Sequence, residues 1–250
     1  MELGFKHQLG LICVIMLFPA LCNGKEYYNK SRAAYYVTSD GYGSPRGACG
    51  FGDYGRTVND GHVTDLSARL WNNGGGCGAC YQVRCKIAQY CDYNGAYVVA
   101  TDYGEGDRTD FTLSPRAFSK LGRDKVASEA LKKYSVLDVE YKRVPCTFKG
   151  NTIVFQINKQ YSSNPGYFAI VILYVGGTSH VTSVEFLRKE HHKWEPLHRS
   201  YGAIFDIAKP PRGEIRLKFQ VSGSEGLHWV EPKFAIPANW KAGATYSTNL

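Results

Sequence analysis

The chain has 250 residues, of which 44% are hydrophobic and 21% charged, the balance of a globular protein long enough for more than one domain. Its 30 Lys and Arg outnumber its 22 Asp and Glu, which gives a formal net charge of +8. Such an excess attracts acidic polymers, acidic membranes or nucleic acid, or it serves solubility alone. No long block of Lys and Arg is present, which argues against a nucleic-acid-binding arm.

The chain begins with the pattern of a secretory signal. Lys6 and His7 precede an apolar run over residues 9–21, and small or polar residues follow at 22–24. This arrangement predicts a signal peptide at residues 1–24. The run is shorter than the roughly 20 residues of a membrane-spanning helix. We therefore expect a secreted, extracellular glycoprotein with no membrane partner, in which Asn29 of the sequon Asn29-Lys30-Ser31 is the glycosylation site.

The cysteines are confined to one part of the mature chain. Two of the eight, Cys13 and Cys22, lie in the signal segment. An oxidising compartment favours disulfides among the remaining six, which allow fifteen pairings. The spacing of Cys77 and Cys80 also fits half a zinc site or a redox pair, but no histidine cluster lies nearby. Because no cysteine follows residue 146, we expect two domains, at 25–149 and 150–250.

Helices are predicted at two places only. Residues 64–71 place Leu66 and Leu70 on one face of a helix, and residues 114–121 begin with a Ser114 that can cap the first turn. The rest of the chain favours strands by composition or by alternation of apolar residues. The candidate strands lie at 81–84, 97–100, 151–158, 168–175, 181–187 and 214–222. After residue 146, strands separated by turn residues predict an all-β sandwich.

Several short motifs distributed over nearly the whole mature chain together resemble one family, the plant expansins. They are GACGFG at 47–52, CGACYQVRC at 77–85, TD at 101–102, LSPRAF at 113–118, YKRVPC at 141–146, NPGY at 164–167, YVGG at 174–177 and PANW at 237–240. Within that family, TDYGEGD at 101–107 is most similar to the expansin-like B branch.

The resemblance implies a mainly β fold: an N-terminal double-psi β-barrel related to family-45 glycoside hydrolases, followed by an immunoglobulin-like β-sandwich that binds cellulose. It also implies one disulfide pairing out of the fifteen. The implied bridges join Cys49 to Cys77, Cys80 to Cys146, and Cys85 to Cys91.

The same resemblance identifies a groove in the first domain that lacks one expected carboxylate. Glycoside hydrolysis generally requires a carboxylic acid and a second carboxylate. Asp102 matches one aspartate of the family, but the position of the second is Thr112. Asp110 precedes it by two residues, which displaces a strand Cα by roughly 6 to 7 Å, too far for proton transfer. Ala34 replaces a threonine that the family usually has in this groove. We therefore predict no catalytic residue, with Asp102 and Asp110 as polysaccharide contacts.

Aromatic residues are the other expected contacts with polysaccharide, because a flat ring stacks on the apolar face of a sugar. By resemblance, Tyr35 and Tyr36 line the groove of the first domain, and Tyr167 and Tyr201 lie on the cellulose-binding face of the second. Trp194 is a neighbour of that face, flanked by Lys193 and Glu195. Two further aromatic residues are expected in the core, Phe205 and Trp229.

Three functional hypotheses follow. The favoured one is a monomeric wall protein, with no metal or cofactor, that binds polysaccharide and loosens the wall without hydrolysis. Its partners would be cellulose, xyloglucan or another glucan, with pectin an option because of the net charge. The alternatives are a family-45-like endoglucanase and an allergen-like wall protein that binds a protein partner.

Overall fold

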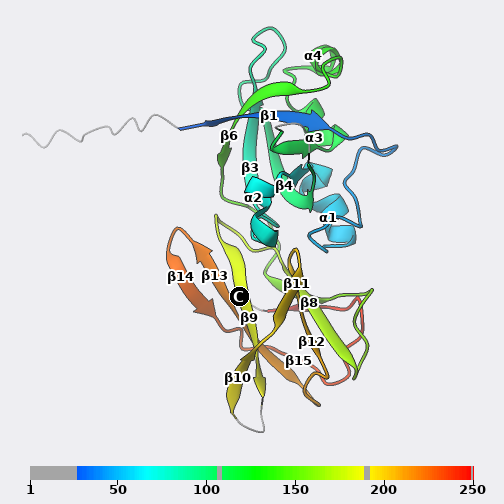
Figure 1. The fold of residues 1–250 in the computed structure, drawn as a ribbon, viewed down its shortest axis with the longest axis vertical. Helices are drawn as coiled ribbons and strands as arrows, with labels where there is room; N and C mark the ends of the chain where they lie inside the picture. The colour runs from blue at the N-terminus through cyan, green and yellow to red at the C-terminus, as the bar shows by residue number, and fades with distance from the viewer. Residues whose placement is uncertain (1–26, 106–108, 189–191, 249) are drawn as a thin grey trace, which may run out of the picture.

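The protein consists of two β-rich bodies stacked along its long axis (Figure 1). The computed structural model describes residues 27–105, 109–188, 192–248 and 250. The expected signal peptide at 1–24 lies outside these residues. Across the described part of the chain, no helix combines the length and the apolar character needed to span a membrane.

The first body is a closed six-stranded barrel with the strand order β1-β5-β2-β4-β3-β6. Parallel pairing joins β1 to β5 and β2 to β4, whereas the other neighbours are antiparallel. The strands are β1 (Asn29–Tyr35), β2 (Val63–Leu66), β3 (Cys80–Cys85), β4 (Ala96–Tyr103), β5 (Phe111–Leu113) and β6 (Leu137–Arg143). The short helices are α1 (Asp53–Thr57), η1 (Val58–Gly61), α2 (Ala68–Trp71), η2 (Asn72–Gly74), α3 (Pro115–Ser119) and α4 (Lys125–Leu131).

One of the two predicted helices is confirmed and the other is partly wrong. Ser114 caps α3 as expected, since its hydroxyl accepts a hydrogen bond from the Ala117 N–H at 3.1 Å. The first half of the predicted helix at 64–71 is strand β2, and only Ala68–Trp71 is helical. The helical spacing of Leu66 and Leu70 is overridden because β2 pairs with both β4 and β5.

Three disulfides cross-link the first body, and they are the pairs that the family resemblance implied. Each bond can contribute a few kcal/mol by restricting the unfolded chain. The bridges are Cys49–Cys77, Cys80–Cys146 and Cys85–Cys91.

The second body is a sandwich of two sheets, β10-β9-β13-β14 with β15 on β13, and β11-β12-β8-β7-β16. Apolar side chains alternate along the strands and fill the space between the sheets; those of β13 are Ile215, Leu217, Phe219 and Val221, as predicted. The strands are β7 (Val154–Ile157), β8 (Tyr167–Leu173), β9 (His180–Arg188), β10 (Lys193–Pro196), β11 (His198–Tyr201), β12 (Ile204–Ala208), β13 (Ile215–Gly223), β14 (Gly226–Val230), β15 (Ala235–Ile236) and β16 (Thr245–Ser247). The expected fold class, a β-barrel followed by a β-sandwich, is confirmed.

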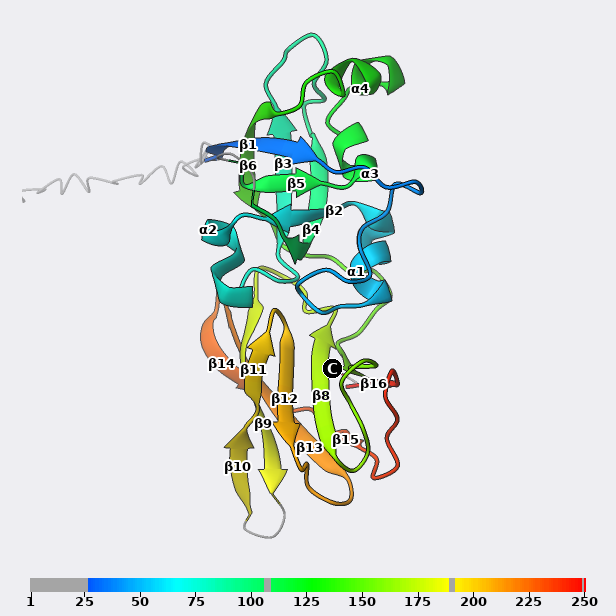
Figure 2. The ribbon, with the colours of Figure 1, turned by 45° about the vertical axis from the view of Figure 1, so that its right-hand side comes forward.

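The chain between the two bodies runs from the end of β6 at Arg143 to the start of β7 at Val154. The predicted domain boundary between residues 149 and 150 falls within this connection and stays a prediction. The connection itself contacts the second body, since Cys146 pairs with Gly177. A further contact is made where the hairpin of β11 and β12 reaches up to the barrel (Figure 2).

Glycines allow the two backbones to approach closely at this contact, which we call the joint. A methyl group on Gly50 would lie 2.5 Å from Ile204 Cγ1, and one on Gly74 would lie 2.3 Å from the Gly202 carbonyl oxygen. A methyl group on Gly202 itself would lie 2.2 Å from the Ala48 carbonyl oxygen. All three glycines have positive φ, which other residues rarely adopt.

An apolar cluster surrounds the joint, so the two bodies share a packed interface in addition to the connecting chain. Cys49 and Phe51 of the barrel pack with residues of the second body, and the Ala203 N–H donates to the Cys49 carbonyl at 3.0 Å. The residues of the second body in this cluster are Ala169, Val171, Leu173 and Ile204. Because these side chains are buried only when the two bodies are together, we expect the full chain to behave as one unit.

The importance of the joint can be tested with two glycines of equal backbone conformation. Gly50 and Gly150 both have a φ of 75°, but nothing lies within 4 Å of a methyl group at Gly150. Gly150→Ala should lower the free energy of unfolding by about 1 kcal/mol through backbone strain alone. Gly50→Ala should lower it by about 2 to 4 kcal/mol, because the new methyl group also displaces Ile204. Urea denaturation under non-reducing conditions measures both, and equal losses would contradict a tightly packed joint.

Candidate functional site

Four positions on neighbouring strands form a row on the outer face of the barrel, which we call the carboxyl row. The register pairs Ala34 of β1 with Thr112 of β5, Thr112 with Asp65 of β2, and Asp65 with Asp102 of β4. Side chains directly opposite each other on adjacent strands point to the same side of a sheet. Both neighbours of Thr112 in β5 are buried in the barrel core, so the row faces outwards.

The backbone holds Asp102 as a hydrogen-bond acceptor. Its Oδ1 accepts from the Ala48 N–H at 2.6 Å and from the Tyr103 N–H at 2.7 Å. A methyl group on Gly47 would lie 3.2 Å from the Asp102 carboxyl, so the loop of residues 47–50 packs directly on it. Asp102 is therefore fixed in place at the end of the row nearest the joint.

Asp65 was not identified from the sequence, yet it stands beside Asp102 in the row. It is partly buried, and among the described residues no hydrogen bond to its carboxyl is recorded. Burial, and secondly the charge of Asp102, raise the pKa of Asp65 to about 7. In mildly acidic solution Asp65 is therefore neutral and can donate its O–H, while Asp102 accepts.

The two consecutive tyrosines point to opposite sides of the barrel wall, as alternation along a strand requires. Tyr36 follows the end of β1, and its pKa is raised by burial and by the nearby charges of Asp65 and Asp102, so its ring borders the row. Tyr35 packs on Phe118 with a centroid separation of 4.3 Å, and its hydroxyl donates to the Lys132 carbonyl at 3.2 Å. The structure thus brings Tyr36 to the row and turns Tyr35 towards the core.

Asp110 is engaged in its own hydrogen-bond network at the edge of the barrel. Its carboxylate accepts from the Ser31 hydroxyl at 2.5 Å and the Ser67 hydroxyl at 2.7 Å, and it forms an ion pair with Arg69. Burial by itself would raise the pKa of Asp110, but the hydrogen bonds from Ser31, Arg69 and Ser67 outweigh it and lower the pKa. Asp110 is thus a charged anchor between strands, and both of its carboxylate oxygens already accept hydrogen bonds.

Two more rings, also not identified from the sequence, meet at the end of β4. Trp71 at the end of α2 meets Tyr103 with a centroid separation of 5.6 Å. Tyr103 directly follows Asp102 and is exposed. Tyr103 is the Cα partner of the core residue Leu66, so it leaves β4 on the side opposite to the carboxyl row.

In the second body, the outer face of the sheet β11-β12-β8 carries a group of tyrosines, which we call the tyrosine platform. Tyr167 donates its hydroxyl to Asp206 Oδ2 at 2.7 Å, and Tyr201 meets Tyr161 edge to face at 6.1 Å. Tyr161 is 47% exposed and Tyr201 is 39% exposed. The platform therefore consists of Tyr161, Tyr167 and Tyr201, of which Tyr161 was not foreseen.

The joint connects the platform to the carboxyl row. A methyl group on Gly50 would lie 3.2 Å from Tyr201 Cε2, and one on Gly47 would lie 3.2 Å from the Asp102 carboxyl. Gly50 follows Gly47 by three positions, a span of about 11 Å at most. The row and the platform therefore lie next to each other across one loop.

Trp194 is placed on the other sheet of the sandwich, on β10, and does not join the platform. The Lys218 ammonium lies 4.8 Å from the centre of the Trp194 ring and 4.3 Å from that of Trp229. Trp229 is 40% exposed on β14, so the expectation that it is a core residue is wrong. Phe205, in contrast, is buried in the core as expected.

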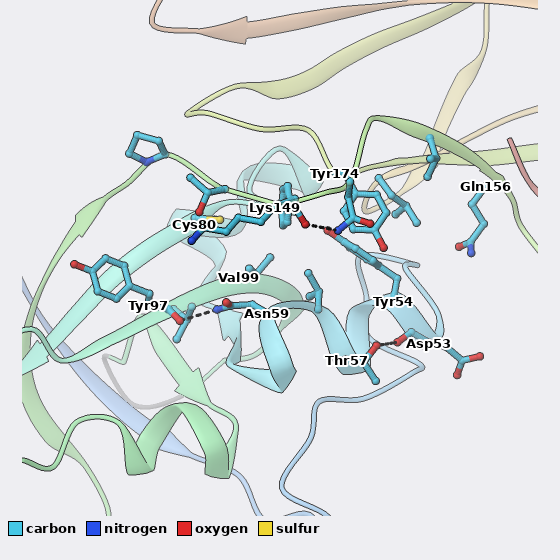
Figure 3. A pocket seen from close by; sticks show the side chains of 18 of the residues that line it. Asp53, Tyr54, Thr57, Asn59, Cys80, Tyr97, Val99, Lys149, Gln156 and Tyr174 are labelled. Carbon is cyan, nitrogen blue, oxygen red and sulfur yellow. Dashed lines mark hydrogen bonds between the residues drawn. The ribbon is translucent and has the colours of Figure 1, made fainter. Parts of the chain in front are cut away.

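A separate hollow of about 640 Å³ lies between α1 and η1 of the barrel and β7 and β8 of the sandwich (Figure 3). No residue of the carboxyl row lines it. Its polar side chains are partly used within the protein, since Asn59 donates to the Tyr97 carbonyl at 2.9 Å and Thr57 donates to the Asp53 carbonyl at 3.0 Å. We therefore place the candidate site at the row and the platform.

The remaining predicted contacts concern modification and metals. Asn29 is the exposed first residue of β1, and its glycosylation stays a prediction. Among the described residues, no group of three or more His, Cys, Asp or Glu side chains is arranged to hold a metal ion.

Fold and site together define a class of protein: a double-psi β-barrel with an acidic row on its outer face, joined to an immunoglobulin-like sandwich with an aromatic face. A family model described as the expansin C-terminal domain matches residues 153–237, and one described as a lytic transglycolase matches residues 63–141. Expansin-like B1 of Arabidopsis thaliana is 48% identical over 95% of this chain and 94% of its own length. Expansin-like B1 of Oryza sativa subsp. japonica is 37% identical over 98% and 96%.

The chain belongs to the expansin family, and the predicted resemblance to the expansin-like B branch is confirmed. A solved structure of expansin from Clavibacter michiganensis, without ligand, matches with a TM-score of 0.64 at 16% identity. It covers 88% of this chain and 96% of that protein, and at this identity the likeness shows the fold alone.

The raised pKa of Asp65 predicts how the free energy of unfolding changes with pH. Asp65→Asn should increase the free energy of unfolding at pH 8 by on the order of 2 kcal/mol, because the wild-type carboxylate must be charged there beside Asp102. The folded-state pKa lies above the unfolded value, so the wild type loses stability as pH rises from about 4 to about 7. At pH 4 the variant and the wild type should therefore be nearly equal in urea denaturation.

Asp110→Asn is the matched control, with the opposite sign. The pKa of Asp110 is lowered in the folded protein, so its charge stabilises the fold at pH 8 and this contribution disappears as pH falls towards 3. Asp110→Asn should therefore destabilise the protein at pH 8. If both substitutions shift stability in the same direction at pH 8, the charge assignment in the row is wrong.

Proposed function

We propose that this protein is a secreted cell-wall protein that binds a glucan chain without hydrolysing it, and that this binding loosens the wall. The observation that carries the proposal is the adjacency of the carboxyl row and the tyrosine platform across the loop of residues 47–50. Acidic groups bind sugar hydroxyls and tyrosine rings stack on sugar faces, so the combined surface fits an extended polysaccharide better than a small molecule.

Binding is favoured over hydrolysis by the arrangement of the carboxyl groups. Asp65 and Asp102 project from adjacent strands, which are about 4.8 Å apart. This spacing is too short for an inverting glycosidase, which needs roughly 6.5 to 9.5 Å between its two carboxyls to hold a water molecule. A retaining glycosidase has its carboxyls about 5 to 5.5 Å apart, but one of them must attack the sugar carbon, and Asp102 Oδ1 is already held by the Ala48 and Tyr103 N–H groups. Asp110, another acid near the row, already accepts hydrogen bonds from Ser31, Ser67 and Arg69. A water-activating base is therefore not assigned.

The family supports both the location and the type of ligand. A solved structure of a single-residue mutant of the Clavibacter michiganensis expansin is in complex with cellohexaose, and it matches this fold with a TM-score of 0.64 at 18% identity. We infer from this likeness that the present chain binds glucans such as cellulose. The expected signal peptide and the family relationship support an extracellular location in the wall.

Removing the exposed rings of the platform should weaken binding to insoluble cellulose. Each ring stacked on sugar contributes about 1 to 2 kcal/mol, so Tyr161→Ala combined with Tyr201→Ala should weaken binding about ten-fold or more. The affinity should change little with salt, because stacking is not Coulombic. Pull-down of the full chain on cellulose across a salt series measures both effects.

Two further variants locate the binding face in that experiment. Tyr134→Ala removes an exposed tyrosine just after α4, the helix at the end of the barrel away from the sandwich (Figure 1), and should leave binding unchanged. Trp194→Ala tests the opposite sheet of the sandwich. If Trp194→Ala loses binding while the double tyrosine variant binds fully, the glucan-binding face lies on the sheet β10-β9-β13-β14 and not on the platform.

Hydrolysis should be undetectable in the wild-type protein. Losing one positioned acid or base lowers the rate of a glycosidase about 100-fold to 10,000-fold, and the residue at the second expected position is Thr112. Asp65 on the adjacent strand is displaced from that position by about 4.8 Å, which is too far for it to take over the proton transfer. Incubation with soluble glucan and measurement of released reducing ends tests this. Sustained release that is abolished by Asp102→Ala would instead support the endoglucanase hypothesis.

A further inference from the structure

We propose that Asp65 supplies the second carboxyl of the groove from strand β2, in place of the carboxyl that Thr112 lacks, and that Asp65 and Asp102 together bind adjacent hydroxyls of a neutral glucan. This inference rests on the proposed function, and it names the class of glycan that the groove selects. Thr112 is the Cα partner of Asp65, so the carboxyl has moved sideways by a single strand spacing.

Sheet geometry allows a carboxyl on β2 to take the place of one on β5. The spacing between adjacent strands is about 4.8 Å, and paired residues project to the same side. A carboxyl on β2 therefore reaches towards the space above Thr112, which a carboxyl on β5 would fill. Asp110, two residues along β5, cannot do the same because Ser31, Ser67 and Arg69 fix it at the barrel edge.

The surroundings of Asp65 leave its carboxyl available to a ligand. A methyl group on Gly104 would lie 3.0 Å from Asp65 Cβ, and the Gly104 N–H donates to the Leu66 carbonyl at 3.0 Å, so the backbone after β4 supports the side chain from one side. Within the described residues, no donor satisfies the carboxyl. A partly buried polar group without a partner is costly, and a sugar hydroxyl would remove that cost.

A protonated Asp65 beside the hydrogen-bond acceptor Asp102 matches the chemistry of a sugar. A neutral Asp65 offers a donor and an acceptor, and Asp102 offers an acceptor that two backbone N–H groups hold in position. Adjacent sugar hydroxyls each donate and accept, so they complement this pair. A uronic acid brings its own negative charge towards Asp102 and is disfavoured. The groove therefore selects neutral glucans over pectin, although the whole chain is basic.

Few titratable side chains influence the charge state of Asp65 and Asp102. The titratable side chains facing Asp65 are Asp102 from β4 and Tyr36 after β1, and Thr112 from β5 carries no charge. Asp40 influences Tyr36 but is not among the groups that shift Asp65. No Lys, Arg or His of the described residues is recorded in contact with the Asp65 carboxyl. Because the pKa of Asp65 is raised to about 7, the pair should lose its donor as pH rises through neutrality.

The test is calorimetric binding of cellohexaose to the full chain at pH 5.5 and pH 8.5. The affinity of the wild type should be about five-fold to ten-fold higher at pH 5.5 than at pH 8.5, because the protonated Asp65 makes one additional hydrogen bond to the sugar. Asp65→Asn keeps a donor and an acceptor at both pH values, so its affinity should be high and independent of pH. Asp65→Ala should bind about ten-fold more weakly than the wild type at pH 5.5.

A rescue variant separates a direct role of Asp65 from a structural one. Asp65→Ala combined with Thr112→Asp returns the carboxyl to β5 and should recover most of the lost affinity. Glu129→Gln, on the exposed surface of α4, is the control and should bind as the wild type does. Polygalacturonate replaces cellohexaose in a parallel series and should show no dependence on Asp65.

The possible results of these binding experiments lead to different conclusions. If the wild type binds neither cellohexaose nor cellulose, the proposed function fails and this inference fails with it. If the wild type binds but Asp65→Ala binds equally well at both pH values, only the assignment of Asp65 is overturned. Failure of the rescue variant, with a normal Asp65→Asn profile, would overturn the equivalence of the β2 and β5 positions. A stronger effect of Asp65→Ala on polygalacturonate would overturn selection of neutral glycan.

Discussion

The close approach of two backbones at the joint is the constraint on which the arrangement of the site depends. Gly50, Gly74 and Gly202 pack so closely that any Cβ at these positions would collide with the other body. The Cys49–Cys77 bridge ties the loop of Gly50 to the segment that follows Gly74. A loop held in this way has little freedom, so its two ends fix Asp102 relative to Tyr201. The site is therefore rigid across a domain contact, where independent motion is the usual expectation.

Barrel topology explains how residues distant in sequence share one surface. The parallel pairs β1–β5 and β2–β4 place Ala34, Thr112, Asp65 and Asp102 side by side although long stretches of chain separate them. A position in such a row is defined by its place on the sheet and not by its place in a motif. Loss of a carboxyl at one strand can consequently be compensated at the next, which a motif comparison along the chain does not detect. This is why Thr112 signals a loss when the sequence is inspected alone and a displacement when the strands are paired.

The sequence predicted the features that depend on local pattern or on whole-family likeness. Cysteine number and export predicted bridges, alternation predicted strands such as β13, and the motifs predicted the family. Asp65 was not predicted, because Leu66 and Leu70 have helical spacing and only pairing with β4 and β5 makes the segment a strand. The separation of Tyr35 from Tyr36 depends on which face of β1 is turned inwards. Trp229 was assigned to the core because its neighbours are apolar, but it lies on the outer face of an edge strand.

The distribution of charge separates attraction from selection. A net charge of +8 acts over about 8 to 10 Å at physiological ionic strength and draws the protein to any acidic polymer, whatever its sugar sequence. The groove has the opposite character, because Asp65 and Asp102 stand together without a basic partner among the described residues. A polymer held by the basic surface is thus repelled at the row, whereas a neutral chain lying alongside it gains hydrogen bonds and ring contacts there. Under the proposed function, this combination would concentrate the protein on acidic wall polymers while the carboxyl row engages a neutral glucan that lies next to them.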